Sequence, residues 1–266
     1  MNITVLVPTH HKSKEDIINL YHFLRIKGDA LIANQNGINE TYELNIDNHK
    51  VKVVCTDTVG VSKNRNILLD NAYGDICLCT DDDCPLVDNY LNIVSNFFNA
   101  HKCEYVLFNG LVPYESNRKV HNKKTKKVHS IFDVSYAGGP GLAFKTECIK
   151  KYNFRYNEKM GYPNYIYLGE DTHMLNQICD SKAIFFRSSE ILFSVDIDKE
   201  DNSTYFKGFE EQFFVVKGVN FKNMFPRIYW LLTIHYCLKL SKQSGLKYKE
   251  IRKAFKKGFQ IANQYK

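Results

Sequence analysis

The sequence contains no apolar run of the ~18 to 20 residues that a helix needs to cross a bilayer. The first apolar stretch, residues 3–7, is too short for the core of a secretory signal peptide. The eight cysteines are scattered and lack the regular spacing of a disulfide-rich secreted domain. We therefore expect a cytoplasmic protein with reduced thiols.

The sequence motifs of three common enzyme classes are also missing. The chain has no G-x-x-x-x-G-K-[ST], no G-x-G-x-x-G and no G-x-S-x-G, which argues against a P-loop, a dinucleotide fingerprint and a nucleophile elbow. It has no internal repeat and no Gly/Ser-rich linker. With 44% hydrophobic and 24% charged residues, the 266 residues can bury a sizeable core, which excludes wholesale disorder.

Positive charge is concentrated at the carboxyl end of the chain. The net charge is +7, from 36 Lys and Arg against 29 Asp and Glu. Residues 239–266 hold nine Lys and Arg against Glu250 alone, a local net charge of +8. A second basic cluster lies in the polar stretch 118–129. Basic clusters favour anionic partners, but no segment resembles a module that reads bases, so we expect no nucleic-acid partner.

Short apolar strands alternate with helical patterns in the first half, which predicts βαβ units and a mostly parallel sheet. The strands are expected at residues 2–7, 30–34, 51–55, 75–80, 104–109, 183–187 and 191–195. Helices are expected to begin near residues 13, 60, 88, 170 and 209. The simplest division is an α/β domain over residues 1–205 and a basic, mostly helical extension over residues 206–266.

Three successive aspartates, Asp81, Asp82 and Asp83, directly follow the apolar strand at residues 75–80. Open α/β sheets bind ligands at the carboxyl ends of their strands. Adjacent carboxylates repel one another unless a cation or hydrogen-bond donors neutralise them, and hard oxygen ligands suit Mg²⁺ or Mn²⁺. The triplet therefore predicts a metal site, with a solvated acidic turn as the alternative.

Two helix starts have the chemistry of a site. The run Gly-Val-Ser-Lys-Asn-Arg-Asn at residues 60–66 combines free backbone N–H groups with two cations, which suits a diphosphate or nucleotide. Glu170 and Asp171 follow Gly169 at a later helix start, where a carboxylate could act as a general base. The alternatives are a serine-capped helix with solvated cations and ordinary compensation of the helix dipole.

Taken in order, these segments resemble family 2 glycosyltransferases of the GT-A fold. The resemblance is carried by Val-Leu-Val-Pro-Thr at residues 5–9, by residues 60–66, by residues 74–83 and by residues 169–171. It spans residues 1 to about 205 and looks closest to bacterial enzymes that build surface polysaccharides, in which a pair like Ser203-Thr204 and a segment like Lys217-Gly218 follow. It implies a GT-A (Rossmann-like) central, mostly parallel sheet flanked by helices, with a C-terminal helical appendage.

The resemblance also implies roles for individual residues. The residues expected to contact the donor nucleotide are Pro8, Thr9, Gln35, Ser62, Arg65, Asp81 and Asp82. Asp81 and Asp83 would hold Mn²⁺ or Mg²⁺. Where many relatives have a histidine ligand, either Asp198 or Asp196 would replace it, or the triplet alone would hold the metal. Gly138, Gly139 and Pro140 would lie beside the transferred sugar. Asp171 would be the catalytic base, with Glu170 as its substitute.

The implied activity is inverting, metal-dependent transfer of a hexose or N-acetylhexosamine from a nucleotide sugar, expected to be UDP-linked, to a growing glycan such as capsule or O-antigen. A lipid-linked acceptor would place the enzyme at the inner face of the cell membrane, where the basic extension could lie on anionic lipid. That extension could equally pack on the domain with a solvated basic face. The alternatives are a nucleotidyltransferase and a non-catalytic glycan- or nucleotide-binding relative of the same fold.

Overall fold

The computed structural model describes residues 1–111, 123–135, 137–194, 209–242 and 244–266. The first half contains β1 (Ile3–His10), α1 (Lys14–Phe23), β2 (Ala30–Gln35), β3 (Glu40–Ile46), β4 (His49–Thr56), α2 (Val61–Asn71), β5 (Ile76–Cys79) and α3 (Tyr90–Ala100). The second half contains β6 (Tyr105–Leu111), β7 (Lys126–Lys127), β8 (Leu142–Lys145), α4 (Glu147–Tyr152), α5 (Glu170–Asp180), β9 (Phe185–Ser194), α6 (Glu211–Met224), α7 (Tyr229–Leu240) and α8 (Tyr248–Ile261).

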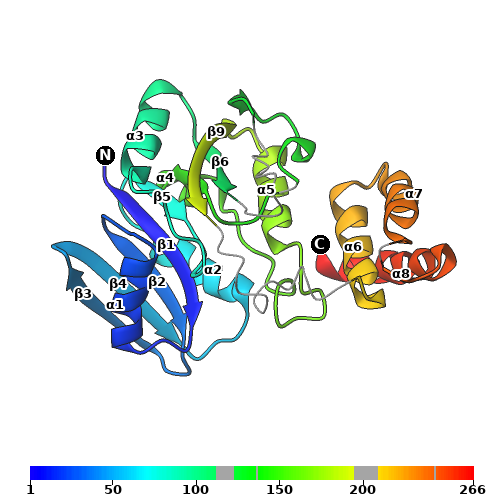
Figure 1. Cartoon of the computed structure of the whole chain (residues 1–266), viewed down its shortest axis with the longest axis horizontal. Coiled ribbons are helices and arrows are strands. Elements are labelled where there is room, and N and C mark those ends of the chain that lie inside the picture. The colour runs from blue at the N-terminus through cyan, green and yellow to red at the C-terminus, as the bar shows by residue number, and fades with distance from the viewer. Residues whose placement is uncertain (112–122, 136, 195–208, 243) are drawn as a thin grey trace.

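The strands form one sheet in the order β3-β4-β2-β1-β5-β8-β6-β9-β7. Neighbours in the block β4-β2-β1-β5 are parallel, and β8 lies antiparallel between β5 and β6. Helices flank the sheet and further helices follow at the carboxyl end (Figure 1), which confirms the predicted fold class. The chain runs from β1 to β2 and β4 in one direction and then returns to β5 on the other side of β1. This reversal creates a crevice at the carboxyl ends of β1 and β5, where such sheets bind ligands.

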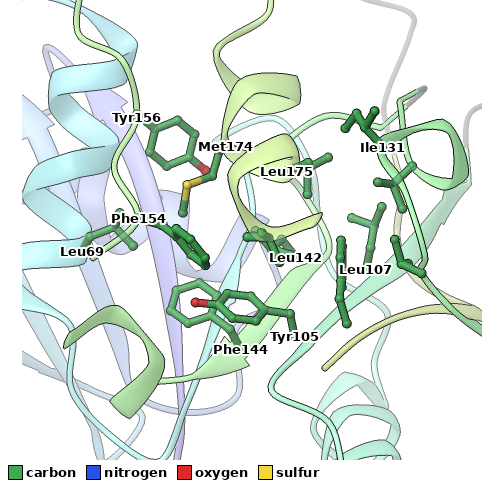
Figure 2. Packing of buried hydrophobic residues seen from close by; sticks show 14 of the residues in the cluster. Leu69, Tyr105, Leu107, Ile131, Leu142, Phe144, Phe154, Tyr156, Met174 and Leu175 are labelled. Atoms are coloured by element: carbon green, nitrogen blue, oxygen red, sulfur yellow. The ribbon is translucent and has the colours of Figure 1, made fainter. Parts of the chain in front are cut away.

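Alternating side chains of the strands build two hydrophobic cores. In β1, Val5 and Val7 pack in the core that includes residues of α1 and α3, whereas Leu6 packs in the core that includes residues of α2 and α5. This follows from the two-residue repeat of a strand buried on both faces. Figure 2 shows the second core, in which the rings of Tyr105, Phe144 and Phe154 lie together. Both layers of helices are thus anchored to the central strands.

Three strands were not predicted from the sequence. β3 pairs antiparallel with β4 through a hairpin whose central residues, Asp47 and Asn48, both have positive φ, as a two-residue hairpin turn requires. The short strands β7 and β8 were also missed. The strands expected at residues 183–187 and 191–195 are one strand, β9, up to Ser194, with an irregular register opposite Asn109; residue 195 lies outside the described residues.

The last three helices pack on one another, on the right of Figure 1. α6 and α8 approach closely at two glycines, since a Cβ at Gly218 would lie 2.7 Å from the carbonyl oxygen of Phe255. The expected boundary at residues 205/206 falls in 195–208, outside the described residues, so the division into two domains stays a prediction. Ser203 and Thr204 lie there too. Among the described residues, no helix combines the length and the apolarity that crossing a membrane requires.

Candidate active site

The ends of β1 and β5 bring the first site residues together. β1 and β5 are parallel neighbours, so Thr9 at the end of β1 lies close to the aspartates that follow β5. The Thr9 hydroxyl donates a hydrogen bond of 2.7 Å to Oδ2 of Asp82. Pro8, also near the end of β1, lines a small cavity together with Arg65, Asp81 and Gly139. Four separate segments predicted from the sequence therefore converge here.

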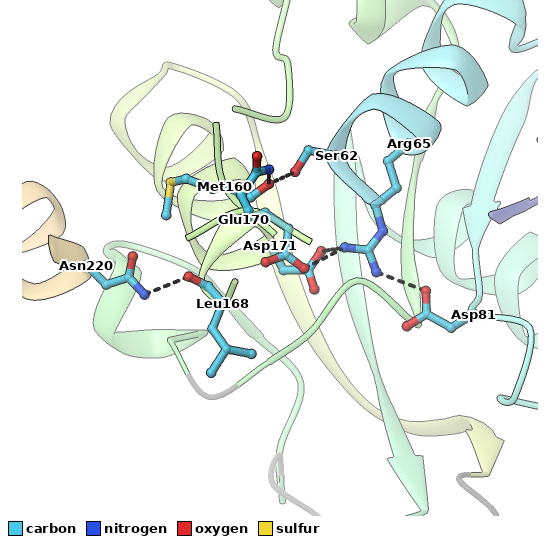
Figure 3. Close-up of polar contacts among 9 residues, drawn as sticks. Ser62, Arg65, Asp81, Met160, Leu168, Glu170, Asp171 and Asn220 are labelled. Carbon is cyan, nitrogen blue, oxygen red and sulfur yellow. Dashed lines mark hydrogen bonds and ion pairs between the residues drawn. The ribbon is translucent and has the colours of Figure 1, made fainter. Parts of the chain in front are cut away.

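Arg65 of α2 lies at the centre of this site (Figure 3). One terminal nitrogen of its guanidinium is 2.6 Å from Oδ1 of Asp171 and 3.2 Å from Oε1 of Glu170. The other terminal nitrogen is 3.0 Å from Oδ1 of Asp81. The side chain of Arg65 is only 9% exposed, so these are ion pairs in a partly desolvated site rather than weak surface pairs. Arg65 thereby joins the acidic end of β5 to the start of α5.

The charges of these four groups influence one another strongly. Burial alone would lower the pKa of Arg65, but the carboxylates of Asp171, Asp81 and Glu170 raise it, so the guanidinium stays protonated. Burial, with the neighbouring Asp171 charge, raises the pKa of Glu170 to about 7. Burial also raises the pKa of Asp171, and Arg65 opposes that shift. A carboxyl group with a raised pKa accepts a proton more readily, which suits a general base.

The glycine loop predicted to border the sugar lies against Asp171 and Arg65. A Cβ at Gly139 would be 2.9 Å from Oδ1 of Asp171 and 3.2 Å from a guanidinium nitrogen of Arg65. The backbone N–H of Gly139 also donates a hydrogen bond to Asp171. At Gly138 a Cβ would be 3.7 Å from Oδ2 of Asp171 and 3.5 Å from Pro140. The chain therefore needs glycine at position 139 in order to pass this close to the carboxylate.

The start of α2 is held by hydrogen bonds within the protein. The N–H of Val61 donates to the carbonyl oxygen of Tyr162 at 3.0 Å. The hydroxyl of the buried Ser62 donates to the carbonyl oxygen of Met160 at 2.7 Å. The amide of Gln35, at the end of β2, donates to the carbonyl oxygen of Gly60 at 3.1 Å. These contacts place Ser62 and Gln35 as supports of the loop before α2, and their contact with a nucleotide stays a prediction.

Among the described residues, the group of side chains best suited to a cation lies at the acidic triplet and includes the cysteine that follows it. Ligand atoms of Asp81, Asp83 and Cys84 all lie within 4.8 Å of one another. Burial raises the pKa of Asp83, and the charges of Asp81 and Asp82 raise it further, a repulsion that a bound cation would relieve. Burial also raises the pKa of the Cys84 thiol, so the two carboxylates are the better ligands.

Carboxylate oxygens suit Mg²⁺ or Mn²⁺, which keep several positions for water and phosphate, so Asp81 and Asp83 fit the predicted metal. Asp198 and Asp196, expected as additional ligands, lie outside the described residues. The identity of any further protein ligand stays a prediction.

Two asparagines of the 60–66 run and a tyrosine, to which the sequence analysis gave no individual role, support Arg65. The side-chain amide of Asn64 donates to the carbonyl oxygens of Thr9 and Ala33 at 2.9 and 3.1 Å, which ties α2 to β1 and β2. Asn66 exchanges two hydrogen bonds with the backbone of Tyr156, whose ring centroid is 5.5 Å from the guanidinium carbon of Arg65. The run at residues 60–66 contains both asparagines, but no local pattern gives their contacts or marks Tyr156, because the partners are distant in the chain.

α6 supports the turn from which Glu170 and Asp171 emerge. Gly169 has a φ of 104°, and a Cβ there would be 2.2 Å from the side-chain nitrogen of Asn220. Asn220 of α6 donates a hydrogen bond of 3.1 Å to the carbonyl oxygen of Leu168 (Figure 3). Glycine at position 169 is thus required by both backbone conformation and space. The C-terminal helices therefore contribute to the position of the predicted base.

His173 is a further, half-buried group that the sequence analysis missed. It lies in the first turn of α5, and its Nε2 has no hydrogen-bond partner among the described residues. Burial lowers the pKa of His173 to about 4, so the imidazole is neutral at neutral pH. Its position two residues after Asp171 was the only signal in the sequence.

Comparison with known proteins gives a family and a set of similar structures. The family model of glycosyl transferase family 2 matches residues 31–161, a range that includes Arg65, the acidic triplet and Gly139 but ends before Asp171. No curated protein sequence matches the chain.

The similar solved structures include three of S. aureus TarS. The structure of TarS residues 1–349 has a TM-score of 0.61 and 13% identity, and the match covers 98% of this chain and 92% of that chain. Its complex with UDP-GlcNAc has a TM-score of 0.63 and 15% identity, over 98% and 82% of the two chains. Its complex with UDP has a TM-score of 0.55 and 14% identity, over 100% and 72%.

At these identities the structural matches establish the fold, and the family model supplies the class of enzyme. The matches cover nearly the whole chain, including the part beyond the range of the family model. Residues 31–161 match glycosyl transferase family 2, and the chain is a glycosyltransferase with the GT-A fold.

Proposed function

We propose that this glycosyltransferase inverts the anomeric centre as it transfers a hexose or N-acetylhexosamine from a UDP-sugar to a growing surface glycan. The observation that carries this proposal is the position of Arg65, whose guanidinium contacts both Asp81 and Asp171. The acidic end of β5 and the start of α5 therefore face one site, where a donor diphosphate and an acceptor hydroxyl can meet.

Asp171 is the general base in this proposal. Its raised pKa and its position beside the glycine loop support that role. The carboxylate removes the proton of the acceptor hydroxyl while that oxygen forms a bond to the anomeric carbon. The bond from this carbon to the diphosphate oxygen breaks on the opposite face, and the diphosphate leaves with the bonding electron pair. Attack and departure on opposite faces invert the configuration.

Asp81 and Asp83 would hold a divalent cation beside the donor. Mn²⁺ or Mg²⁺ bound there would neutralise charge on the departing diphosphate. Asp81 is shared with Arg65 at 3.0 Å, so the same carboxylate would orient the guanidinium and contribute to the metal site. Thr9, hydrogen-bonded to Asp82, would keep the triplet facing the crevice.

The choice of UDP and the glycan acceptor rest on similarity. A structure with this fold, that of S. aureus TarS, contains UDP-GlcNAc, and another contains UDP. UDP-GlcNAc is accordingly the first donor to test.

The eight cysteines of the chain all lie in described positions and are all free, which supports a location in a reducing compartment such as the cytoplasm.

Thermal unfolding with a panel of nucleotides tests the donor and the metal together. UDP, GDP, CDP, TDP and their common sugars are each added with and without Mn²⁺, because a ligand that binds the folded state raises Tm. We expect a Mn²⁺-dependent rise with a UDP-sugar. Absence of any rise with every nucleotide would contradict the proposed donor class.

Asp83→Ala makes the same experiment specific to the acidic triplet. The variant should lose the Mn²⁺-dependent part of the rise, since one of two carboxylate ligands is gone. Asp88→Ala is the matched control, because Asp88 is a nearby aspartate whose side chain is 75% exposed and pairs with Lys27. That control should keep the full rise, and an equal loss in both variants would argue against a metal at Asp83.

A further inference from the structure

The helix α7 has one face that packs on its neighbours and one that does not. On the packed face, the ring of Tyr229 is 4.7 Å from that of Phe259, and the ring of Tyr236 is 5.0 Å from that of Phe221, centroid to centroid. The opposite face carries four large apolar side chains whose exposed fractions are 53%, 48%, 42% and 64%, in the order Trp230, Leu231, Ile234 and Leu238. We call these four residues the α7 stripe.

The α7 stripe is a continuous feature of the helix. Its members are spaced by one, three and four residues, which places them within about 100° of one another around an α-helix. Single exposed apolar residues are normal on a protein surface and need no explanation. Four on adjoining turns of one helix form a patch, and such patches mark interaction surfaces.

The segment that contains the stripe carries cations and no acids. Residues 212–249 contain no Asp or Glu. The same segment contains seven cations: Lys217, Lys222, Arg227, Lys239, Lys242, Lys247 and Lys249. Arg227, Lys239 and Lys242, which lie next to α7 or at its end, are exposed. α8, which packs against α7, exposes three more cations in Arg252, Lys253 and Lys256. It also carries Glu250 and Lys257, the latter paired with Glu211 of α6.

We propose that the α7 stripe binds the surface of a lipid bilayer that contains anionic lipids. The apolar side chains would enter the interface between headgroups and acyl chains, and the surrounding cations would pair with lipid phosphates. Trp230 suits this position because an indole ring is apolar and carries one polar N–H. A helix of 12 residues is too short to span a bilayer, so α7 would lie on the membrane.

Charge favours a membrane over a second copy of this chain. Two α7 stripes facing each other would bring two sets of cations together, and like charges across an interface oppose association. An anionic bilayer supplies both the apolar layer and the opposite charge. The contact also has a consequence for the enzyme, because α6 packs on α7 and holds the turn before Glu170 through Asn220. The active site would then be held at a fixed distance from the bilayer.

The membrane contact does not depend on the proposed donor or reaction, and one residue reports on it directly. Trp230 is the only tryptophan in the chain, so all tryptophan fluorescence comes from the α7 stripe. The full chain is titrated with vesicles of phosphatidylcholine alone and of phosphatidylcholine with phosphatidylglycerol. We expect a blue shift of the emission with the anionic vesicles, weaker binding as salt is added, and quenching by lipids brominated in their acyl chains.

Two double variants test whether vesicle binding depends on the α7 stripe or on exposed apolar residues in general. Leu231→Gln with Leu238→Gln should weaken binding to anionic vesicles about tenfold or more. Ile18→Gln with Ile38→Gln, which changes two apolar residues with exposed fractions of 39% and 51% elsewhere, should bind like the wild type. Circular dichroism and thermal unfolding confirm that both variants are folded.

Three results would overturn the proposal. The first is the absence of a blue shift and of acyl-chain quenching for the wild type with anionic vesicles. The second is a loss of binding that is equal in the two double variants. The third is a blue shift that grows with protein concentration in the absence of vesicles, which would assign the stripe to self-association.

Discussion

At the scale of single residues, the site is organised around a cation that contacts three carboxylates. Arg65 pairs with Asp171 across 106 positions of the chain and with Asp81 across 16. Burial and ionic contact act in opposite directions on Asp171, and the pKa of that carboxyl is raised on balance. The balance leaves a carboxylate that is ionised by its contact with Arg65 and still able to take a proton during reaction.

Asp171→Asn tests the base at this scale. The amide keeps the shape of the side chain but cannot accept a proton, so transfer should fall by about 10² to 10⁴, while donor binding changes by less than about twofold. The rate of product formation at saturating donor measures transfer, and a titration with donor measures donor binding. Glu170→Gln is the matched variant and should retain more activity. Equal losses in both variants would remove the distinction between the two carboxyl groups.

His173 predicts a pH dependence of stability. Burial lowers the pKa of His173 to about 4 in the folded protein, whereas an unfolded histidine titrates near 6.5. The unfolded state therefore binds more protons between these values, so stability is complete above pH ~6.5 and falls as the pH drops toward 4.

His173→Gln removes this titration, so the stability of the wild type relative to the variant should fall by about 2 kcal/mol between pH 8 and pH 5. Denaturant unfolding of both proteins at the two pH values measures that change. Parallel pH dependence in the two proteins would contradict a buried neutral imidazole.

Much of the site could be expected from single residues, but their supports could not. The sequence and its resemblance predicted that Pro8, Arg65, the aspartates, the glycine loop and Asp171 would form one site, and the structure places them together. The individual roles of Asn64, Tyr156 and His173 were missed because they come from the surroundings of these side chains in the fold. Burial of a polar side chain depends on segments that are distant in the sequence, such as the contact between Asn66 and the backbone of Tyr156.

At the scale of elements, local patterns identified the buried strands and missed the edges of the sheet. β1, β2 and β4 are apolar runs that a parallel sheet buries. β3 alternates exposed and half-buried positions along most of its length, a weaker signal that is typical of an edge strand. β8 has four residues and lies antiparallel between β5 and β6, a placement that depends on the path of the whole chain.

The crossing of α6 and α8 gives a prediction for these helices. A Cβ at Gly258 would be 2.2 Å from the carbonyl oxygen of Val215 and 3.0 Å from Cα of Gly218. Gly258→Ala should therefore force the helices apart and lower the free energy of unfolding by about 1 to 3 kcal/mol. Gln260→Ala, at an exposed position of the same helix, is the control and should leave stability nearly unchanged. Calorimetric unfolding compares the two, and full stability of Gly258→Ala would contradict the close crossing.

At the scale of the whole molecule, several parts of the fold position the residues of one crevice. These parts are the sheet, its two layers of helices and the C-terminal group of helices. The sheet reverses its strand order beside β1, α2 supplies Arg65, and α5 supplies Asp171. α6 supports the start of α5 through Asn220. The fold class could be predicted because alternating strands and helices have few compact arrangements. The contact of the C-terminal helices with the site could not, because no sequence pattern pairs Asn220 with Leu168.

The anomeric configuration of the released sugar depends on all of these parts together. UDP-GlcNAc, an α-linked donor, is incubated with the enzyme and Mn²⁺ in the absence of acceptor, so that water takes the place of the acceptor hydroxyl. Proton NMR at early times identifies the anomer that forms first. Inverting transfer with Asp171 as the base predicts the β-anomer, and its rate should fall in Asp171→Asn. Initial formation of the α-anomer would contradict the inverting mechanism.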